Sequence, residues 1–315
     1  MDFRRLRYFV QVVEARSMSA AAARLHVAQP ALSKTIRALE DELGAPLLQR
    51  SARGVAMTEA GERLYEHCQI ILGQVERARH AVRSSLARPS GQVAIGMPYS
   101  VMMVLGLPLL EVVSREYKEL RLELVQDHSH LFAGRLRAGR LDMAVMAAQR
   151  SGAGLLASTL LLEDLVFVEK PVPGAPRGRP VSFQEAARRS FILPALGNGL
   201  RAAAEAYFRT RSLRLTVAHE VNGIGLILRA VAAGLGVSLL PGGCVAGDPL
   251  AAELDIRPPE AGCVRTIVLC RAEGALATPA SLRTEDVLRA VAADLVASGG
   301  WPGGRLVDTA LASAA

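Results

Sequence analysis

The chain has 315 residues, of which 50% are apolar and 21% are charged, so it is long enough for two or three globular domains. This composition excludes a disordered, a collagen-like or a disulfide-framed protein. The 37 Lys and Arg residues exceed the 30 Asp and Glu residues, and residues 1–92 alone hold 14 basic and nine acidic side chains. A basic N-terminal part followed by a nearly neutral remainder predicts that any polyanion binds at the N-terminus.

Cysteine usage and hydropathy both indicate a cytoplasmic protein. The four cysteines form no C-x-x-C pair and are interpreted as reduced, partly buried thiols. No apolar segment of a signal peptide follows the first arginines, and the most membrane-like stretch, 224–240, is interrupted by an arginine and several glycines. We therefore expect no contact with a membrane. The cysteines are Cys68, Cys244, Cys263 and Cys270.

Residues 1–58 have the periodicity of a compact helical unit. Apolar residues recur at helical spacing from Phe3 to Val13, which predicts a first helix with one apolar stripe. Ser17 and Ser19 are both suitable N-terminal caps for a second helix, which the alanines that follow them favour.

A third helix is expected after a tight turn. It should begin at Gln29, with a proline in the first turn where proline is tolerated, and end near Leu43, before Gly44. Its apolar positions define a core face, and its other face is polar and basic. Two helices joined by a tight turn, the second with long polar side chains on its free face, predict a helix-turn-helix. The core-face residues are Leu32, Ile36, Leu39 and Leu43.

The free face of this third helix carries residue types that recognise DNA. Glutamine pairs with an adenine edge, serine bonds to a base or a phosphate, and lysine and arginine bind guanine or phosphate. A hairpin expected over 47–57, turning at 52–54, would form a wing that holds two arginines toward the duplex backbone. The alternative is that this is merely a solvated helix face. It is disfavoured because the turn, the wing and the charge excess occur together. The candidate DNA-binding residues are Gln29, Pro30, Ser33, Lys34, Arg37, Arg50 and Arg53.

Residues 59–89 are predicted to form one long linker helix, capped by Thr58. Apolar residues advance along it by four and three in alternation, which is the seam of a coiled coil. The helix would span about 42 Å, too long for the small N-terminal unit to cover it. A second copy of the chain is the simplest partner, and packing on the chain's own C-terminal part is the alternative. The expected dimerisation residues are Leu64, Cys68, Ile71, Val75, Ala78 and Val82.

Residues 90–298 alternate between β-rich runs and helical stretches, which predicts an α/β domain with mostly parallel sheets. Its length suits two lobes, with a ligand cleft where strand ends meet helix starts. The tail, 299–315, is rich in small residues and is expected to be poorly ordered. Strands are expected at 92–96, 120–126, 141–146, 164–168, 190–193, 215–221, 236–240 and 264–270, and helices at 105–117, 131–138, 183–189, 200–211, 224–233 and 281–296.

Several runs of residues resemble the LysR-type transcriptional regulators, and together they cover nearly the whole chain. The N-terminal runs are FRRLRYFV at 3–10, SMSAAAARL at 17–25, AQPALS at 28–33, LEDELG at 39–44, LLQR at 47–50 and GVAMTEAG at 54–61. The later runs are SGQVAIG at 90–96, GRLDMAV at 139–145 and VAAGLGVSLLP at 231–241. Within the family, the opening residues and the segments 28–29, 58–61 and 141–145 are similar to the nitrogen assimilation control branch.

The resemblance implies a homodimer or homotetramer that binds double-stranded promoter DNA and contacts RNA polymerase. Two winged helix-turn-helix units would sit on a coiled-coil linker, and a two-lobed domain like a periplasmic binding protein would sense a small molecule. By position, Gln29, Ser33 and Lys34 would touch bases or phosphates, and Pro30 would set the start of the helix. Many members have serine where this chain has Ala28, and losing such a side-chain cap costs about 1 kcal/mol.

The resemblance also implies that four loops, 97–101, 127–130, 195–198 and 221–223, line the effector cleft. Hydroxyl groups near helix N-termini suit an anionic effector such as a carboxylate. Two alternatives are that each polar residue only caps its own helix, and that a regulator of this branch acts without a small effector. The candidate effector-binding residues are Tyr99, Ser100, His128, Ser129, Asn198 and Asn222.

The sequence predicts no catalytic residues, no metal and no cofactor. It contains no H-E-x-x-H, no G-x-S-x-G and no phosphate-binding loop. His128 and His130 lack the further ligands at suitable spacing that a metal needs. The competing class is a soluble small-molecule-binding protein or an enzyme on the same two-lobed domain. Salt-dependent binding to an interrupted palindrome would separate that class from a DNA-binding regulator.

Overall fold

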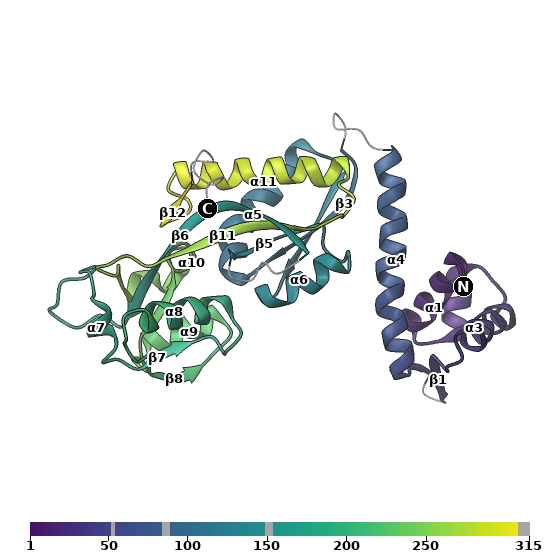
Figure 1. Ribbon diagram of the computed structural model, residues 1–315, viewed down its shortest axis with the longest axis horizontal. Coiled ribbons are helices and arrows are strands. Elements are labelled where there is room, and N and C mark those ends of the chain that lie inside the picture. Colours follow the sequence, from purple (N-terminus) through teal and green to yellow (C-terminus); the bar gives the residue numbers. More distant parts are fainter. Residues whose placement is uncertain (52–53, 84–88, 149–153, 308–315) are drawn as a thin grey trace. The chain divides into compact units, whose positions relative to one another are not determined.

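A computed structural model describes residues 1–51, 54–83, 89–148 and 154–307 of the chain (Figure 1). They form an N-terminal unit, residues 1–83, and a C-terminal unit built from residues 89–137, 141–148 and 154–307. Within these ranges, every helix is too short or too polar to span a lipid bilayer.

The N-terminal unit consists of four helices and a hairpin. Ser17 caps the second helix by accepting a hydrogen bond from the backbone N–H of Ala20, and Gly44 ends the third helix in the left-handed conformation, as the sequence predicts. Its elements are α1 (Phe3–Ala15), α2 (Met18–Leu25), α3 (Gln29–Leu43), β1 (Leu48–Ser51), β2 (Gly54–Met57) and α4 (Glu59–Arg83).

The core of this unit joins the apolar stripes of the helices. Leu32, Ile36 and Leu39 of α3 are fully buried against residues of α1 and α2. Two predicted core residues lie outside it, because Phe3 is 57% exposed and Leu43 is 42% exposed. Both stand at the ends of their helices, where the neighbouring elements no longer cover the apolar stripe.

The hairpin β1–β2 is antiparallel, as expected for a wing, and pairs Ser51 with Gly54. The expected turn residues 52 and 53 lie outside the described residues. A backbone hydrogen bond from the N–H of Val55 to the carbonyl of Arg16 ties the wing to the end of α1. The wing and the helix-turn-helix therefore form one body.

The C-terminal unit has an eight-stranded mixed sheet and a separate pair, β7–β8. The predicted strands and helices are all present, with shifted ends. Its elements are β3 (Gly91–Met97), α5 (Tyr99–Glu116), β4 (Leu120–Gln126), α6 (Ser129–Arg137), β5 (Met143–Ala147), β6 (Leu155–Glu169), α7 (Phe183–Ala186), β7 (Phe191–Leu193), α8 (Gly199–Arg209), β8 (Val217–Glu220), α9 (Ile224–Ala232), β9 (Ser238–Pro241), α10 (Gly242–Ala246), a 3-10 turn (Pro249–Glu253), β10 (Asp255–Arg257), β11 (Val264–Ala272), α11 (Pro279–Ala297) and β12 (Gly304–Arg305).

The prediction of mostly parallel sheets is wrong. The strand β3 pairs in parallel with β4 and β5, but β6 pairs antiparallel with β9, β10, β11 and β12, and β11 pairs antiparallel with β5. The reason is that β6 passes through both lobes: its first part, 155–164, pairs with β11, and its last part, 165–169, pairs with β9 and β10. This crossing path gives the domain its two lobes from a single chain of hydrogen-bonded strands.

In the first lobe, alternate residues of the sheet face opposite layers of helices. Val93, Ile95 and Met97 of β3 pack with α5 and α11, whereas Ala94 packs with Phe132 of α6. This alternation follows from the two-residue period of a strand. The end of β3 and the start of α5 thereby lie at one edge of the sheet, next to the end of β4.

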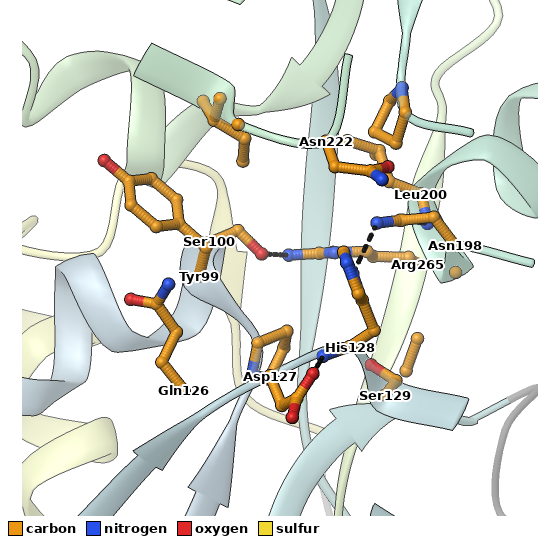
Figure 2. Close-up of a pocket in the computed structure, with 16 residues that line it drawn as sticks. Tyr99, Ser100, Gln126, Asp127, His128, Ser129, Asn198, Leu200, Asn222 and Arg265 are labelled. Carbon is orange, nitrogen blue, oxygen red and sulfur yellow. Dashed lines mark hydrogen bonds between the residues drawn. The ribbon is translucent and has the colours of Figure 1, made fainter. Parts of the chain in front are cut away.

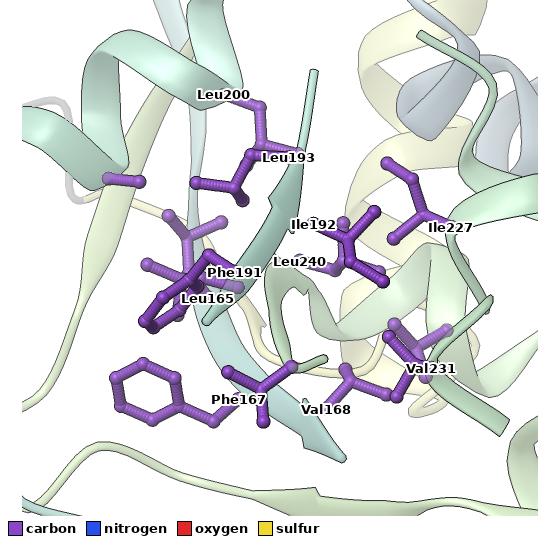
Figure 3. Packing of buried hydrophobic residues seen from close by; sticks show 14 of the residues in the cluster. Leu165, Phe167, Val168, Phe191, Ile192, Leu193, Leu200, Ile227, Val231 and Leu240 are labelled. Atoms are coloured by element: carbon purple, nitrogen blue, oxygen red, sulfur yellow. The ribbon is translucent and has the colours of Figure 1, made fainter. Parts of the chain in front are cut away.

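The second lobe has its own apolar core (Figure 3). Phe191 of β7 packs edge-on against Phe208 of α8, and Phe167 of β6 packs edge-on against Phe183 of α7. Leu239 and other buried residues of β9 complete this core. The lobe thus holds the starts of α8 and α9 in fixed positions.

The expectation of a poorly ordered tail is wrong for residues 299–307. Trp301 is only 1% exposed, and β12 pairs with β6. One buried aromatic ring supplies enough apolar contact to fix a segment whose composition is that of a loop. Residues 308–315 lie outside the described residues.

Candidate functional site

The outer face of α3 presents the polar residues that the sequence singles out. Gln29, Pro30, Lys34 and Arg37 are exposed, and Ser33 is half-buried. Pro30, Lys34 and Arg37 stand on the side of the helix opposite buried Leu32, Ile36 and Leu39, whereas Ser33 lies at the edge of the buried face. A rigid helix with this outer face has the geometry that places side chains in a major groove.

The two ends of α3 differ in charge. At its start, Ala28 makes no side-chain cap, so the first-turn N–H groups stay available beside exposed Gln29. At its end, the carboxylate of Glu42 pairs with the N-terminal amine and with Arg5, and the hydrogen bond from that amine is the main cause that lowers the pKa of Glu42. Glu40 accepts hydrogen bonds from the backbone of the wing. The start of the helix is therefore the end that favours a phosphate.

The wing arginines are placed only in part. Arg50 lies in β1, in register with Val55 of β2. Arg53 falls outside the described residues. Thr58 follows the wing and caps α4, because its hydroxyl oxygen accepts a hydrogen bond from the N–H of Gly61 at 3.0 Å.

The seam of α4 divides into two halves, which corrects the expectation of one continuous dimer interface. Cys68 is fully buried in the core of the N-terminal unit, and Leu64 and Ile71 are half-buried against that core. Farther along, Val75 is half-buried and Ala78 is exposed. Its own unit therefore covers Cys68 fully and the rest of the first three turns in part, so the later turns offer the most uncovered surface to a second copy. The side chain of Val82 lies outside the described set.

A cavity of about 340 Å³ lies between the two lobes of the C-terminal unit (Figure 2). All six residues proposed from the sequence line it, from both lobes: Tyr99, Ser100, His128, Ser129, Asn198 and Asn222. Pro98, Asp127 and Gly223, which belong to three of the loops expected there, also line it. The lining residues outside the expected loops are Gln126, Ala147, Pro194, Gly199, Leu200, Ile224 and Arg265. This size is in the range of small-molecule sites.

Four helices begin at the cavity, and their starts explain why these residues meet. The helices α5, α6, α8 and α9 begin at Tyr99, Ser129, Gly199 and Ile224, and all four residues line the wall. Each helix follows the end of a strand, so the connecting loops converge at one edge of each sheet. Helix N-termini carry partial positive charge, so the cavity favours a ligand with an anionic or strongly accepting group.

Capping accounts for some of the polar residues and not for others. Asn198 caps α8 by accepting a hydrogen bond from the N–H of Leu200 at 2.9 Å. By contrast, Ser100 lies inside the first turn of α5, and Asn222 accepts a hydrogen bond from the N–H of Ala195. Capping therefore explains Asn198 but leaves Ser100 available for another role.

A hydrogen bond joins the two lobes across the cavity. Asn198 Nδ2 lies 3.3 Å from His128 Nδ1. An amide nitrogen only donates, so His128 Nδ1 must accept, and the proton of the neutral ring is on Nε2. Beside it, Asp127 is paired with Arg135 at 2.6 Å, which leaves that carboxylate compensated.

Arg265 is the guanidinium that the sequence reasoning missed. It is 4% exposed and donates from Nη2 to Ser100 Oγ at 2.7 Å (Figure 2). It also pairs with the fully buried carboxylate of Glu163. Glu163 compensates the charge of Arg265, which is what a buried guanidinium requires. The only signal in the sequence was a charged residue within an apolar strand, and no spacing linked it to Ser100, which is 165 residues away.

Metal and thiol chemistry find no support among the residues that the structure describes. These residues contain no group of three or more His, Cys, Asp or Glu side chains placed to hold a metal ion. All four cysteines are buried, and burial raises the pKa of Cys68 and Cys270 to about 11 and that of Cys263 to about 12. A thiol with such a pKa is almost wholly protonated at neutral pH and is a poor nucleophile.

Comparison with known families gives two matches that together span most of the chain. Residues 3–62 match the family described as "Bacterial regulatory helix-turn-helix protein, lysR family". Residues 86–293 match the family described as "LysR substrate binding domain".

Curated proteins and solved structures agree with these matches. The nitrogen assimilation regulatory protein nac of Klebsiella aerogenes is 37% identical over 243 residues, which cover 76% of this chain and 78% of that protein. The full-length CbnR structure, solved in complex with its target DNA, is 22% identical and aligns over 92% of this chain and 100% of its own, with a TM-score of 0.70. A full-length OxyR variant from Pseudomonas aeruginosa is 24% identical and aligns over 92% of this chain and 97% of its own, with a TM-score of 0.66.

Proposed function

This chain belongs to the LysR family of bacterial transcriptional regulators, and we propose that it binds promoter DNA as a homo-oligomer and responds to a small anionic effector. We propose three parts: the winged helix-turn-helix of residues 1–58, the linker segment of 59–89 that begins with α4, and the effector-binding domain of 90–298. We place the regulator in the cytoplasm, where its promoter is.

The outer face of α3 supports the DNA-binding part of this proposal. Gln29, Lys34 and Arg37 are exposed on one side of a helix that follows a tight turn. The start of this helix favours phosphate, so the duplex backbone can fix the helix while Gln29 reaches a base edge. A relative with the same fold is named in complex with its target DNA.

The later turns of α4 support the proposed oligomer. A DNA-binding unit of this size contacts only a few base pairs, and two copies related by a two-fold axis read both halves of a palindrome. Val75 and Ala78 continue the apolar spacing of the helix beyond the part that its own unit covers. These turns are the surface on which a second copy would pack.

The cavity between the lobes supports the effector, and it is the observation on which the sensing role depends. Four helix starts and the Ser100 hydroxyl converge on about 340 Å³ of space. Within the described residues that line it, the two charged pairs, Arg265 with Glu163 and Asp127 with Arg135, are each compensated. A ligand with one anionic group therefore fits this cavity better than a polyanion.

Binding to duplex DNA as a function of salt tests the DNA-binding role. The purified full chain should retain genomic fragments that share an interrupted palindrome, and its affinity for them should fall steeply as salt rises, since phosphate contacts release counterions. A strictly monomeric chain that ignores DNA even in dilute buffer would contradict the proposal.

The Ser100→Ala variant tests the effector role separately. This variant should bind the same palindrome as the wild type but lose its response to the metabolite whose operon the palindrome controls. The matched control is Ser158→Ala, because Ser158 lies in β6 away from the residues that line the cavity. If Ser100→Ala responds like the wild type, the cavity is not the sensing site.

A further inference from the structure

A chain of buried hydrogen bonds runs from the effector cavity to the C-terminal segment. Ser100 Oγ accepts from Arg265 Nη2 at 2.7 Å, and Arg265 Nε donates to Glu163 Oε2 at 2.6 Å. The indole N–H of Trp301 donates to the other oxygen of Glu163 at 2.9 Å. None of the four side chains is more than 4% exposed, so water does not compete for these bonds.

The chemistry of arginine fixes the direction of the hydrogen bond between Arg265 and Ser100. A guanidinium has only donors, so Ser100 Oγ must be the acceptor in its bond with Arg265. Within the described part of the chain, no group accepts the hydroxyl proton of Ser100. Because Ser100 lines the cavity, its O–H is left to donate to a ligand, and the ligand must present an acceptor there.

Glu163 and Trp301 hold Arg265 in the position that this arrangement needs. Both oxygens of Glu163 have partners, Arg265 on one and Trp301 on the other. The indole is itself locked, since a Cβ placed on Gly243 or Gly304 would come within 3.2 Å of it. The strand β12 pairs Gly304 with Glu163, which sets the indole and the carboxylate at neighbouring positions.

The C-terminal segment lies beyond residue 293, where the match to the family's substrate binding domain ends. The contact between Trp301 and Glu163 therefore joins a part of the chain outside that match to a residue inside it. A segment with a purely structural role would need only the apolar packing of the ring. The indole N–H adds a polar contact with the carboxylate that pairs with Arg265.

We propose that Trp301 and Glu163 are positioning residues of the effector site, which hold Arg265 so that the Ser100 hydroxyl donates a hydrogen bond to a carboxylate of the effector. This proposal rests on the proposed function of the cavity. Glu163 also sets how strongly the site attracts an anion, because it offsets the charge of Arg265. The C-terminal segment is then a working part of the sensor.

Three small probes of nearly equal size test the proposal. Acetate presents only acceptors, acetamide presents both kinds of group, and ethylammonium presents only donors. Saturation-transfer NMR on the full chain, with the three probes in one tube, should show acetate binding most strongly and ethylammonium least. Trp301 is the only tryptophan in the chain, so its emission should also change as acetate is added.

Variants of the buried chain should change this selectivity in opposite directions. Ser100→Ala should weaken acetate binding about tenfold, since it removes a hydrogen bond to a charged group. Arg265→Gln should also weaken acetate binding, since it takes away the guanidinium that binds Ser100 Oγ. Trp301→Phe keeps an aromatic ring but loses the N–H, and should lower the ratio of acetate to ethylammonium binding. Glu163→Gln should instead raise the affinity for acetate severalfold, because the charge of Arg265 is then no longer offset and attracts the anionic probe. A misfolded variant does not bind more tightly, so this gain separates positioning from damage.

The control is Arg305→Ala, which alters the same segment at an exposed ion pair with Asp164 and should leave the selectivity unchanged. If Trp301→Phe and Glu163→Gln both keep the wild-type selectivity while Ser100→Ala no longer binds acetate, the positioning role is wrong. The proposal that the cavity binds the effector is unaffected by that result. If Ser100→Ala binds acetate like the wild type, or the wild type does not distinguish the probes, the proposal is wrong. The binding of the palindrome decides the DNA-binding role independently of every one of these outcomes.

Discussion

The outer face of α3 and the cavity of the C-terminal unit hold their side chains in different ways. On α3, Gln29, Lys34 and Arg37 project from one helix and are exposed. In the cavity, Ser100 and Arg265 come from distant parts of the chain and are buried with compensating partners. A substitution on the outer face of α3 should change DNA recognition with little effect on stability. A substitution behind the cavity should change both effector binding and stability.

The largest expected effect is in the buried ion pair behind the cavity. Glu163→Ala should lower the free energy of unfolding by about 3–5 kcal/mol, since it leaves the Arg265 guanidinium buried without a partner. The neighbouring change, Asp164→Ala, removes a largely exposed pair with Arg305 and should cost less than about 1 kcal/mol. Urea unfolding of the two variants measures the difference. Equal costs would show that burial does not distinguish the two pairs.

A smaller effect is expected in the core beneath the DNA-binding face. Ile36→Ala should lower the free energy of unfolding of the N-terminal unit by about 2–5 kcal/mol, because Ile36 is fully buried in its core. Leu43→Ala on the same helix should cost under about 1 kcal/mol, since Leu43 is exposed. Thermal melts of both variants followed by circular dichroism provide the comparison. A large loss from Leu43→Ala would place that residue in an interface that covers it.

The next effect concerns recognition. Gln29→Ala should relax the preference for one base pair of the operator by about 1–3 kcal/mol, since glutamine pairs with an adenine edge. Lys34→Ala serves as the control, because loss of a phosphate contact weakens specific and random duplexes alike and lowers the salt dependence. Competition binding with operators changed at single positions measures both. Equal losses on operator and random duplex for Gln29→Ala would contradict a base contact.

The smallest effect is expected at the start of α3. Ala28→Ser should raise the free energy of unfolding by about 1 kcal/mol, because Ala28 now makes no side-chain cap and serine would supply one. Ala31→Ser, inside the same first turn, is the matched control and should not stabilise the helix. Denaturant midpoints measured without DNA decide between these results.

Local signals predicted the N-terminal unit well. The spacing of Leu32, Ile36 and Leu39 predicts the buried face of α3, and Gly44 predicts its end, because both depend on neighbours within one helix. That Cys68 is covered by the core of its own unit was not predicted, since a heptad seam has the same spacing whichever surface covers it.

Long-range pairing limited the prediction of the C-terminal unit. The first half of β6, from Leu155, is a nearly continuous apolar run whose partner strand lies about 100 residues away, and nothing local sets its direction. The six cavity residues were found because the family resemblance implied which four loops line the cleft. Arg265 and Trp301 were missed, because a buried pair and a single anchoring ring leave no periodic pattern.

The crossing of β6 and β11 limits how the two lobes can move. The two strands are hydrogen-bonded to each other up to the pair of Asp164 with Val264, and a further bond joins the N–H of Leu165 to the carbonyl of Cys263 at the crossing point. A paired ribbon resists bending far more than two separate loops do. We therefore expect a bound ligand to act on the lobes through a twist of this ribbon, which would carry torsion from one lobe to the other.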